Sequence, residues 1–119
     1  MMHELAVTQG ILEVAVDAAK QAGAQRIVAI DLVIGELTGM VDDSIQFYFD
    51  IISRETLAEG AALRFRREPA MVACLDCGQK SEITLPLAIT CLACGSVHLR
   101  VTGGREFRVE SIEVDGAGG

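Results

Sequence analysis

Hydrophobic residues recur at helical spacing in the first part of the chain and predict a helix over residues 5–22. Gly23 follows directly, and glycine is the residue type that most often ends a helix. The apolar stripe of this helix comprises Leu5, Ile11, Leu12, Ala15, Ala18, Ala19 and Ala22. Val14 and Val16 fall outside the stripe, so we expect the helix to be buried on more than one side.

A second helix is predicted over residues 43–54, where apolar residues again recur at helical spacing. Acidic and hydroxyl side chains cluster at its start. Such side chains accept hydrogen bonds from the free N–H groups of a first helical turn, so we expect Asp42, Asp43 or Ser44 to cap this helix.

Three segments predict strands. Residues 26–34 are β-branched and almost continuously apolar, which is typical of a central strand covered on both faces. Residues 61–68 alternate between apolar and charged positions and predict a half-exposed strand. Residues 105–114 also alternate, but the phase slips by one position between 109 and 112, which predicts a β-bulge.

A cysteine-containing segment separates the last two strands. We therefore predict an α+β fold: a small sheet of about three strands with two helices, plus an inserted zinc-ribbon module. The expected domains are residues 1–70, completed by the returning strand 104–115, and the zinc ribbon at 71–103. Gly103 and Gly104 form the expected hinge at the exit from the insert.

Two Cys-x-x-Cys-Gly motifs lie in the insert, and their cysteines are Cys74, Cys77, Cys91 and Cys94. A spacing of two residues lets both sulfurs of a motif turn toward one ion, and four thiolates suit a tetrahedral zinc ion. No open coordination position is implied, so a structural zinc site is predicted. Iron in a rubredoxin-like carrier is the alternative, but the chain is only 4% aromatic and this alternative leaves the first 70 residues unexplained.

Charge and hydropathy narrow the possible partners. The formal net charge is −7, with 17 acidic and 10 basic residues, which disfavours nucleic acid as a partner. No apolar run is long enough to cross a membrane, and the first 20 residues lack the features of a signal peptide. We therefore expect a cytoplasmic protein, where thiols stay reduced and paired Cys-x-x-Cys motifs bind metal.

A second metal site is suggested by the opening residues Met2, His3 and Glu4. A terminal amine, deprotonated backbone amides and the His3 imidazole can surround one ion with nitrogen, in the square-planar geometry that Ni(II) and Cu(II) accept. The alternative is that His3 is an exposed residue near a frayed terminus. His98, close to the cysteine motifs, is interpreted as a surface residue beside a filled site.

Several features in combination resemble the HypA/HybF family of nickel chaperones. These are the Met-His-Glu opening, the double Cys-x-x-Cys insert, the stretch Val33-Ile34-Gly35-Glu36-Leu37 and the closing stretch Gly104-Arg105-Glu106-Phe107-Arg108-Val109-Glu110-Ser111-Ile112-Glu113. The resemblance covers essentially the whole chain, and the order and spacing of its parts make it specific.

The resemblance implies a nickel metallochaperone that is not an enzyme. The family's zinc ligands match the four cysteines, its nickel-binding histidine matches His3, and the next acidic residue matches Glu4. The implied partners are a HypB-type nickel GTPase and the large subunit of [NiFe]-hydrogenase, with urease a further client in some organisms. An acidic residue of the family also lies near Asp42, where helix capping explains it without a metal.

Two alternatives stay open at this stage. This chain begins Met-Met-His-Glu rather than Met-His-Glu, so the amine belongs either to Met1, which gives the four-nitrogen arrangement, or to Met2, which gives the family's arrangement. The competing function is a zinc-ribbon protein-interaction module with no nickel role. Both a monomer and a homodimer are compatible with the sequence.

Overall fold

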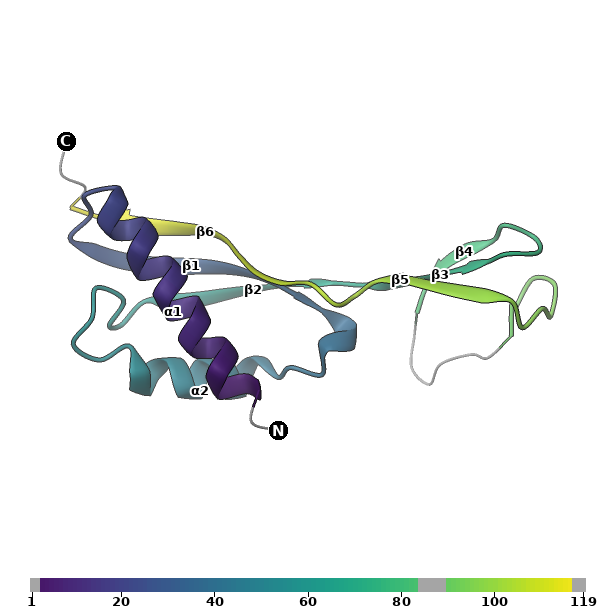
Figure 1. Ribbon diagram of the computed structural model, residues 1–119, viewed down its shortest axis with the longest axis horizontal. Coiled ribbons are helices and arrows are strands. Elements are labelled where there is room, and N and C mark those ends of the chain that lie inside the picture. The colour runs from purple at the N-terminus through teal and green to yellow at the C-terminus, as the bar shows by residue number, and fades with distance from the viewer. Residues whose placement is uncertain (1–2, 84–89, 117–119) are drawn as a thin grey trace.

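The computed structural model describes residues 3–83 and 90–116. Two three-stranded sheets lie end to end in an elongated molecule of 57 × 32 × 16 Å (Figure 1). Two helices cover one face of the first sheet, while the second sheet carries the cysteines. The predicted α+β class with a cysteine-containing insert is confirmed.

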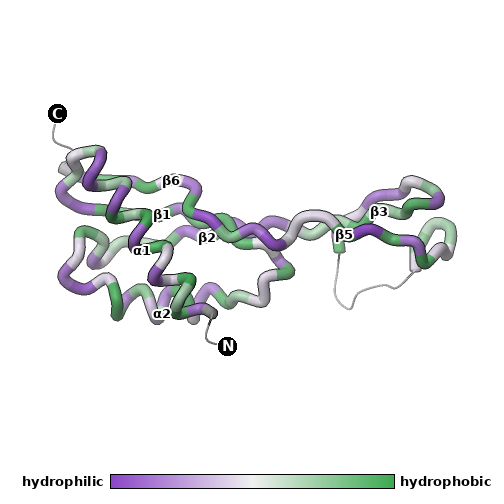
Figure 2. The backbone as a smooth tube through the Cα atoms, in the orientation of Figure 1, coloured by the Kyte–Doolittle hydropathy of each residue, from purple (hydrophilic) through white to green (hydrophobic). Residues whose placement is uncertain are grey.

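Helix α1 spans His3–Gln21 and begins two residues earlier than predicted. It ends as expected: the N–H groups of Gly23 and Ala24 donate to the carbonyls of Lys20 and Ala19, which closes the last turn. Its tube in Figure 2 alternates between hydrophobic and hydrophilic colours, as an amphipathic helix should.

The prediction that α1 is buried beyond its apolar stripe is confirmed for Val16, which packs partly buried against the core, and is wrong for Val14. The buried side chains of the helix form one line, namely Thr8, Ile11, Ala15 and Ala19. Val14, by contrast, is 55% exposed. Thr8 is fully buried although it is polar, because its hydroxyl donates to the carbonyl of Glu4 at 2.5 Å and so needs no water.

Strand β1 (Arg26–Gly35) is central, as predicted, between β2 (Ala62–Glu68) and β6 (Phe107–Asp115). It pairs parallel with β2 and antiparallel with β6. The predicted bulge in the last strand is confirmed, because the pairing register skips Glu110. A second irregularity at Val28 of β1 was not predicted.

Both faces of β1 are covered, but by different chemistry. One face packs on the helices, with Ile30 and Ile34 fully buried. On the other face, Arg64 Nε donates to Asp31 Oδ1 at 2.7 Å, and Val33 on the same face is also fully buried. Hydrogen bonds from Arg64 and Ser111 hold the pKa of the Asp31 carboxyl below its usual value. The resulting stabilisation is present above the carboxyl's unfolded pKa and is lost as pH falls through the lower folded pKa.

Helix α2 spans Asp42–Ile52 and follows a short 3-10 helix, η1 (Glu36–Thr38). The prediction that Asp42, Asp43 or Ser44 caps α2 was wrong. Val41 occupies the cap position, without a side-chain cap, and its carbonyl accepts the N–H groups of Ser44 and Ile45. Asp42 is instead the first helical residue, where its negative charge favours the positive end of the helix dipole.

The second sheet is antiparallel, in the order β4-β3-β5. Its strands are β3 (Ala70–Cys74), β4 (Lys80–Glu82) and β5 (Leu99–Gly103). The sequence located this module but not its individual strands. They are short, and their alternation is weak because most of their residues are at least partly exposed.

The junction between the sheets depends on two glycines packed against each other. A Cβ on Gly35 would collide with the backbone of Gly104. The Gly35 N–H donates to the carbonyl of Glu106, and the Leu37 N–H donates to the carbonyl of Gly104, both at 2.7 Å. Gly104, part of the predicted hinge, is therefore packed against the end of β1 and hydrogen-bonded to the residues that follow it.

Substitution of two glycines by alanine should have opposite effects. Gly35→Ala should lower the free energy of unfolding by roughly 1–3 kcal/mol, because the added methyl group meets backbone atoms. Gly10→Ala should raise it by about 0.5–1 kcal/mol, because alanine favours a helix interior and its Cβ enters open space. Denaturant unfolding of both variants and the wild type measures the difference, and equal stabilities would refute the steric account.

Candidate metal centre

Four sulfurs converge at the end of the second sheet. They belong to Cys74, Cys77, Cys91 and Cys94, and all lie within 4.8 Å of one another. Two of the separations are 3.6 Å and 3.7 Å. These values exceed the ~2.05 Å of a disulfide. A tetrahedron with Zn–S bonds of about 2.3 Å places its sulfurs about 3.8 Å apart, so the four residues fit a zinc ion.

The two cysteine motifs share one backbone pattern. In the first, the N–H of Gly78 donates to the carbonyl of Cys74, and in the second the N–H of Gly95 donates to the carbonyl of Cys91. Both glycines have positive φ, 80° and 77°, which an L side chain rarely adopts. The chain thus builds the same turn twice, and the two turns face each other across the sulfurs.

The turns also favour ionised sulfurs. The backbone N–H of Cys77 points at Cys74 Sγ at 3.4 Å, and hydrogen bonds from the turn lower the pKa of the Cys74 thiol to about 6. A backbone contact from Ser96 lowers the pKa of Cys94, but the neighbouring sulfurs and burial together raise it to about 12. Four adjacent thiolates therefore repel one another unless a cation lies between them.

A polar bridge joins the two turns and was not found from the sequence. The Ser96 hydroxyl donates to Asp76, which lies inside the first motif, and His98 Nδ1 lies 3.0 Å from the same carboxylate oxygen. His98 is a surface residue, as expected, and it does not belong to the cluster of candidate ligand atoms. The three residues of this bridge are separated along the chain, and no periodic pattern in the sequence marks them as partners.

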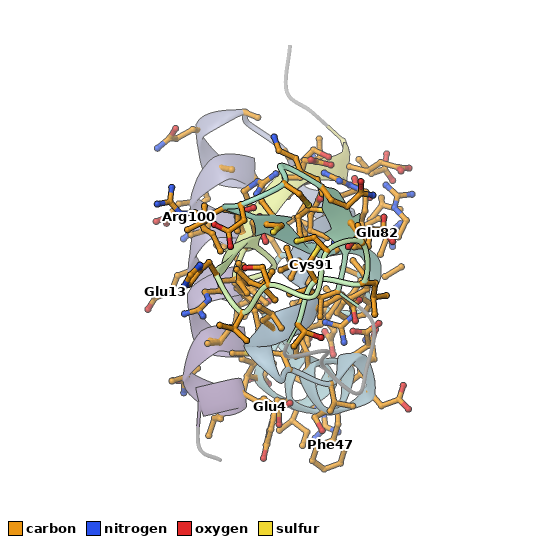
Figure 3. All side chains as sticks on the ribbon, turned by 90° about the vertical axis from the view of Figure 1, so that its right-hand side faces the viewer. Glu4, Glu13, Phe47, Glu82, Cys91 and Arg100 are labelled. Carbon is orange, nitrogen blue, oxygen red and sulfur yellow. The ribbon has the colours of Figure 1, made fainter. Side chains whose placement is uncertain are left out.

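The start of α1 lies in the half of the molecule that contains the first sheet, far from the second sheet (Figure 1). The backbone of His3 begins α1, while Met1, Met2 and the His3 side chain lie outside the described part. Glu4 Oε2 accepts the N–H of Val41 at 2.9 Å. This bond ties the first turn of α1 to the cap of α2, and Figure 3 shows Glu4 at that end of the molecule.

Arg67 stabilises the other side of the same corner. Its Nη2 donates to the carbonyl of Met40 at 2.8 Å and lies 3.4 Å from Asp42 Oδ1, and its Nε lies 3.6 Å from Glu36 Oε1. The segment that carries Val41 is thus held from β2 as well as from α1. Sequence reasoning missed Arg67, because its partners are distant along the chain.

Comparison with known proteins identifies the family. Residues 2–114 match the family model described as "Hydrogenase/urease nickel incorporation, metallochaperone, hypA". The chain belongs to the HypA family. A HypA hydrogenase maturation factor from Dehalococcoides mccartyi is 44% identical, covering 96% of this chain and 95% of its own. One from Geobacter metallireducens is 40% identical, covering 96% of this chain and 100% of its own.

Solved HypA structures share the fold. A solution structure of a HypA protein superposes with a TM-score of 0.70 at 26% identity, covering 98% of both chains. The nickel metallochaperone HypA from Helicobacter pylori gives a TM-score of 0.62 at 25% identity, covering 93% of this chain and 96% of its own. The resemblance inferred from the sequence is confirmed: this is a HypA chain of the nickel metallochaperone family for hydrogenase maturation.

The described helices do not include one that is both long and apolar enough to cross a membrane.

Loss of one cysteine should remove the metal and spare the first sheet. We expect about one zinc per purified wild-type chain, and almost none in Cys91→Ala, because three thiolates bind far more weakly. The core around Phe49 lies in the first sheet and its helices, so its amide signals should persist in the NMR spectrum. Elemental analysis with that spectrum tests this, and full zinc occupancy in Cys91→Ala would contradict it.

Proposed function

We propose that the chain carries one Ni(II) as cargo at its N-terminus for the maturation of [NiFe]-hydrogenase. The nitrogens come from the terminal amine, the backbone of His3 and Glu4, and the His3 imidazole. The observation that supports this most is that α1 begins at His3. The first N–H groups of a helix lack intrahelical partners, so nickel can replace their protons without breaking a helical hydrogen bond.

The four cysteines are proposed to hold zinc as a resident structural ion. Bound zinc would fix the two turns against each other and stabilise the second sheet, whose strands have few buried residues. We also propose that residues 71–103 fold as a zinc-ribbon domain of their own, and that residues 1–70 with 104–115 form the nickel-binding domain. The zinc-ribbon domain would keep its ion and its structure while the N-terminus binds and releases nickel.

Delivery requires partners. We propose that a HypB-type nickel GTPase and the hydrogenase large subunit exchange nickel with this chain in the cytoplasm, where free thiols are stable. Urease is a second proposed client, which the family description also names. An exposed terminal chelate suits transfer, since a partner can displace its nitrogens one at a time.

Nickel titration of two forms of the protein, one beginning at Met1 and one at Met2, tests the N-terminal nickel site. By calorimetry at pH 7.5, zinc-loaded protein beginning at Met2 should bind one nickel, and its His3→Ala variant should lose at least about tenfold in affinity, as expected when one ligand of a chelate is removed. The form beginning at Met1 should also bind, but with a different visible spectrum, because its chelate rings differ. Zinc content should stay unchanged in all three proteins.

Equal nickel binding by wild type and His3→Ala, or none by either, would overturn the terminal site. The chain would then be interpreted as a zinc-ribbon interaction module without a nickel role. Acetylation of the terminal amine provides an independent control, because it removes a proposed ligand without changing any side chain.

Glu4 should act through position rather than coordination by its carboxylate. Glu4→Ala should lower the free energy of unfolding by about 0.5–1 kcal/mol and weaken nickel binding, because the Val41 N–H loses its acceptor. Glu4→Gln keeps an acceptor oxygen and should stay close to wild type in both measurements. Equal losses of nickel affinity in the two variants would instead make the carboxylate a ligand.

A further inference from the structure

Gly10 lies in the interior of α1, and no contact in the described chain explains it. A Cβ built on Gly10 would meet no atom within 4 Å. Glycine is the least favourable residue in a helix interior after proline, so alanine would serve the isolated chain better. A missing side chain at this position leaves room for a molecule that approaches the helix from outside.

Gly10 lines an apolar groove between α1 and the edge strand β6. The groove is lined by Val7, Gly10, Ile11, Val14, Phe107, Arg108 and Val109. Val14 is 55% exposed there, while Phe107 and Val109 are only partly buried. Seen from α1, the groove starts one helical turn after His3, beside the proposed cargo site.

The outer flank of α1 is acidic. Glu13 and Asp17 are exposed and form no ion pair with any of the residues that the structure describes. Figure 3 shows Glu13 pointing away from the sheets. With a net charge of −7 on the chain, this flank attracts cationic groups.

We propose that the groove is the docking site for a basic amphipathic helix of a partner protein. The partner's apolar stripe fills the groove, its backbone passes close to Gly10, and its lysines or arginines face Glu13 and Asp17. The surface goes beyond the proposed function, because neither metal site contributes a residue to it.

A strand or a second copy of the chain fits this surface less well. A strand added to the edge of β6 would lie in the plane of the sheet and would not reach Gly10. That edge is also disrupted by the bulge at Glu110. A second copy would bring another net charge of −7 and another acidic flank to an acidic surface.

Two synthetic peptides test the proposal with the zinc-loaded full chain. Both are helices of about 18 residues with the same leucine and alanine stripe, one with lysines and one with glutamates on its flanks. The lysine peptide should bind and shift the amide NMR signals of Gly10, Val14 and Val109, and the glutamate peptide should bind at least about tenfold more weakly.

Three variants separate the groove from general charge attraction. In Gly10→Leu, the new side chain fills the groove, and leucine is a good helix former. The affinity for the lysine peptide should therefore fall at least about tenfold. The double variant Glu13→Lys, Asp17→Lys should reverse the preference between the two peptides. Phe47→Ala removes an exposed apolar side chain from α2 and should change nothing. Zinc content and nickel binding should match wild type in all three, so failure here is distinguishable from failure of the proposed function.

Unchanged binding of the lysine peptide by Gly10→Leu would overturn the groove as its site. Peptide shifts confined to the outer edge of β6 would show strand addition instead. A wild-type dimer in sedimentation that Gly10→Leu abolishes would mean that a second copy occupies the groove, and it would also overturn the proposal.

Discussion

The contact between Gly35 and Gly104 determines how the two halves of the molecule are connected. The chain passes between the sheets twice, from β2 to β3 and from β5 to β6, and the second crossing lies directly against the end of β1. Because neither glycine has a side chain, the end of β1 and the segment that enters β6 approach closely enough for two backbone hydrogen bonds. These bonds fix where β6 starts, and its register along β1 then places Val109 and Phe107 against the helices.

In the proposed function, the two sheets have different roles: the second sheet holds the zinc ligands and the first sheet supports the nickel-binding terminus. Sulfur ligands lie on rigid turns at one end, where a hydrogen-bonded backbone lowers the pKa of Cys74 and closes around a single position. The free helix terminus lies on the other sheet, where Glu4 and Arg67 hold the corner between α1 and α2. Under the proposed function, a resident zinc ion and a nickel cargo would therefore not compete for the same ligands.

Periodicity and spacing predicted the central features of the fold. The continuous apolar run of β1, the phase slip in β6 and the stop at Gly23 each follow from local chemistry, and the structure bears them out. The spacing of the four cysteines likewise indicated that their sulfurs converge. Long-range polar contacts were not predictable. Val41 caps α2 because Glu4 and Arg67 hold its segment from two distant parts of the chain, and no local preference of Asp42 reveals this.

The insertion of one sheet between two strands of another has a consequence for synthesis. Strand β6 is the last element, so β1 lacks its antiparallel neighbour until almost the whole chain has left the ribosome. Both cysteine turns emerge earlier, so their four sulfurs can converge before β6 is made. A chain that terminates after the second turn would hold all four thiols and an intact N-terminus, yet it would not complete the sheet that supports α1. The topology thereby makes the support of α1 depend on a strand that is synthesised after the whole second sheet.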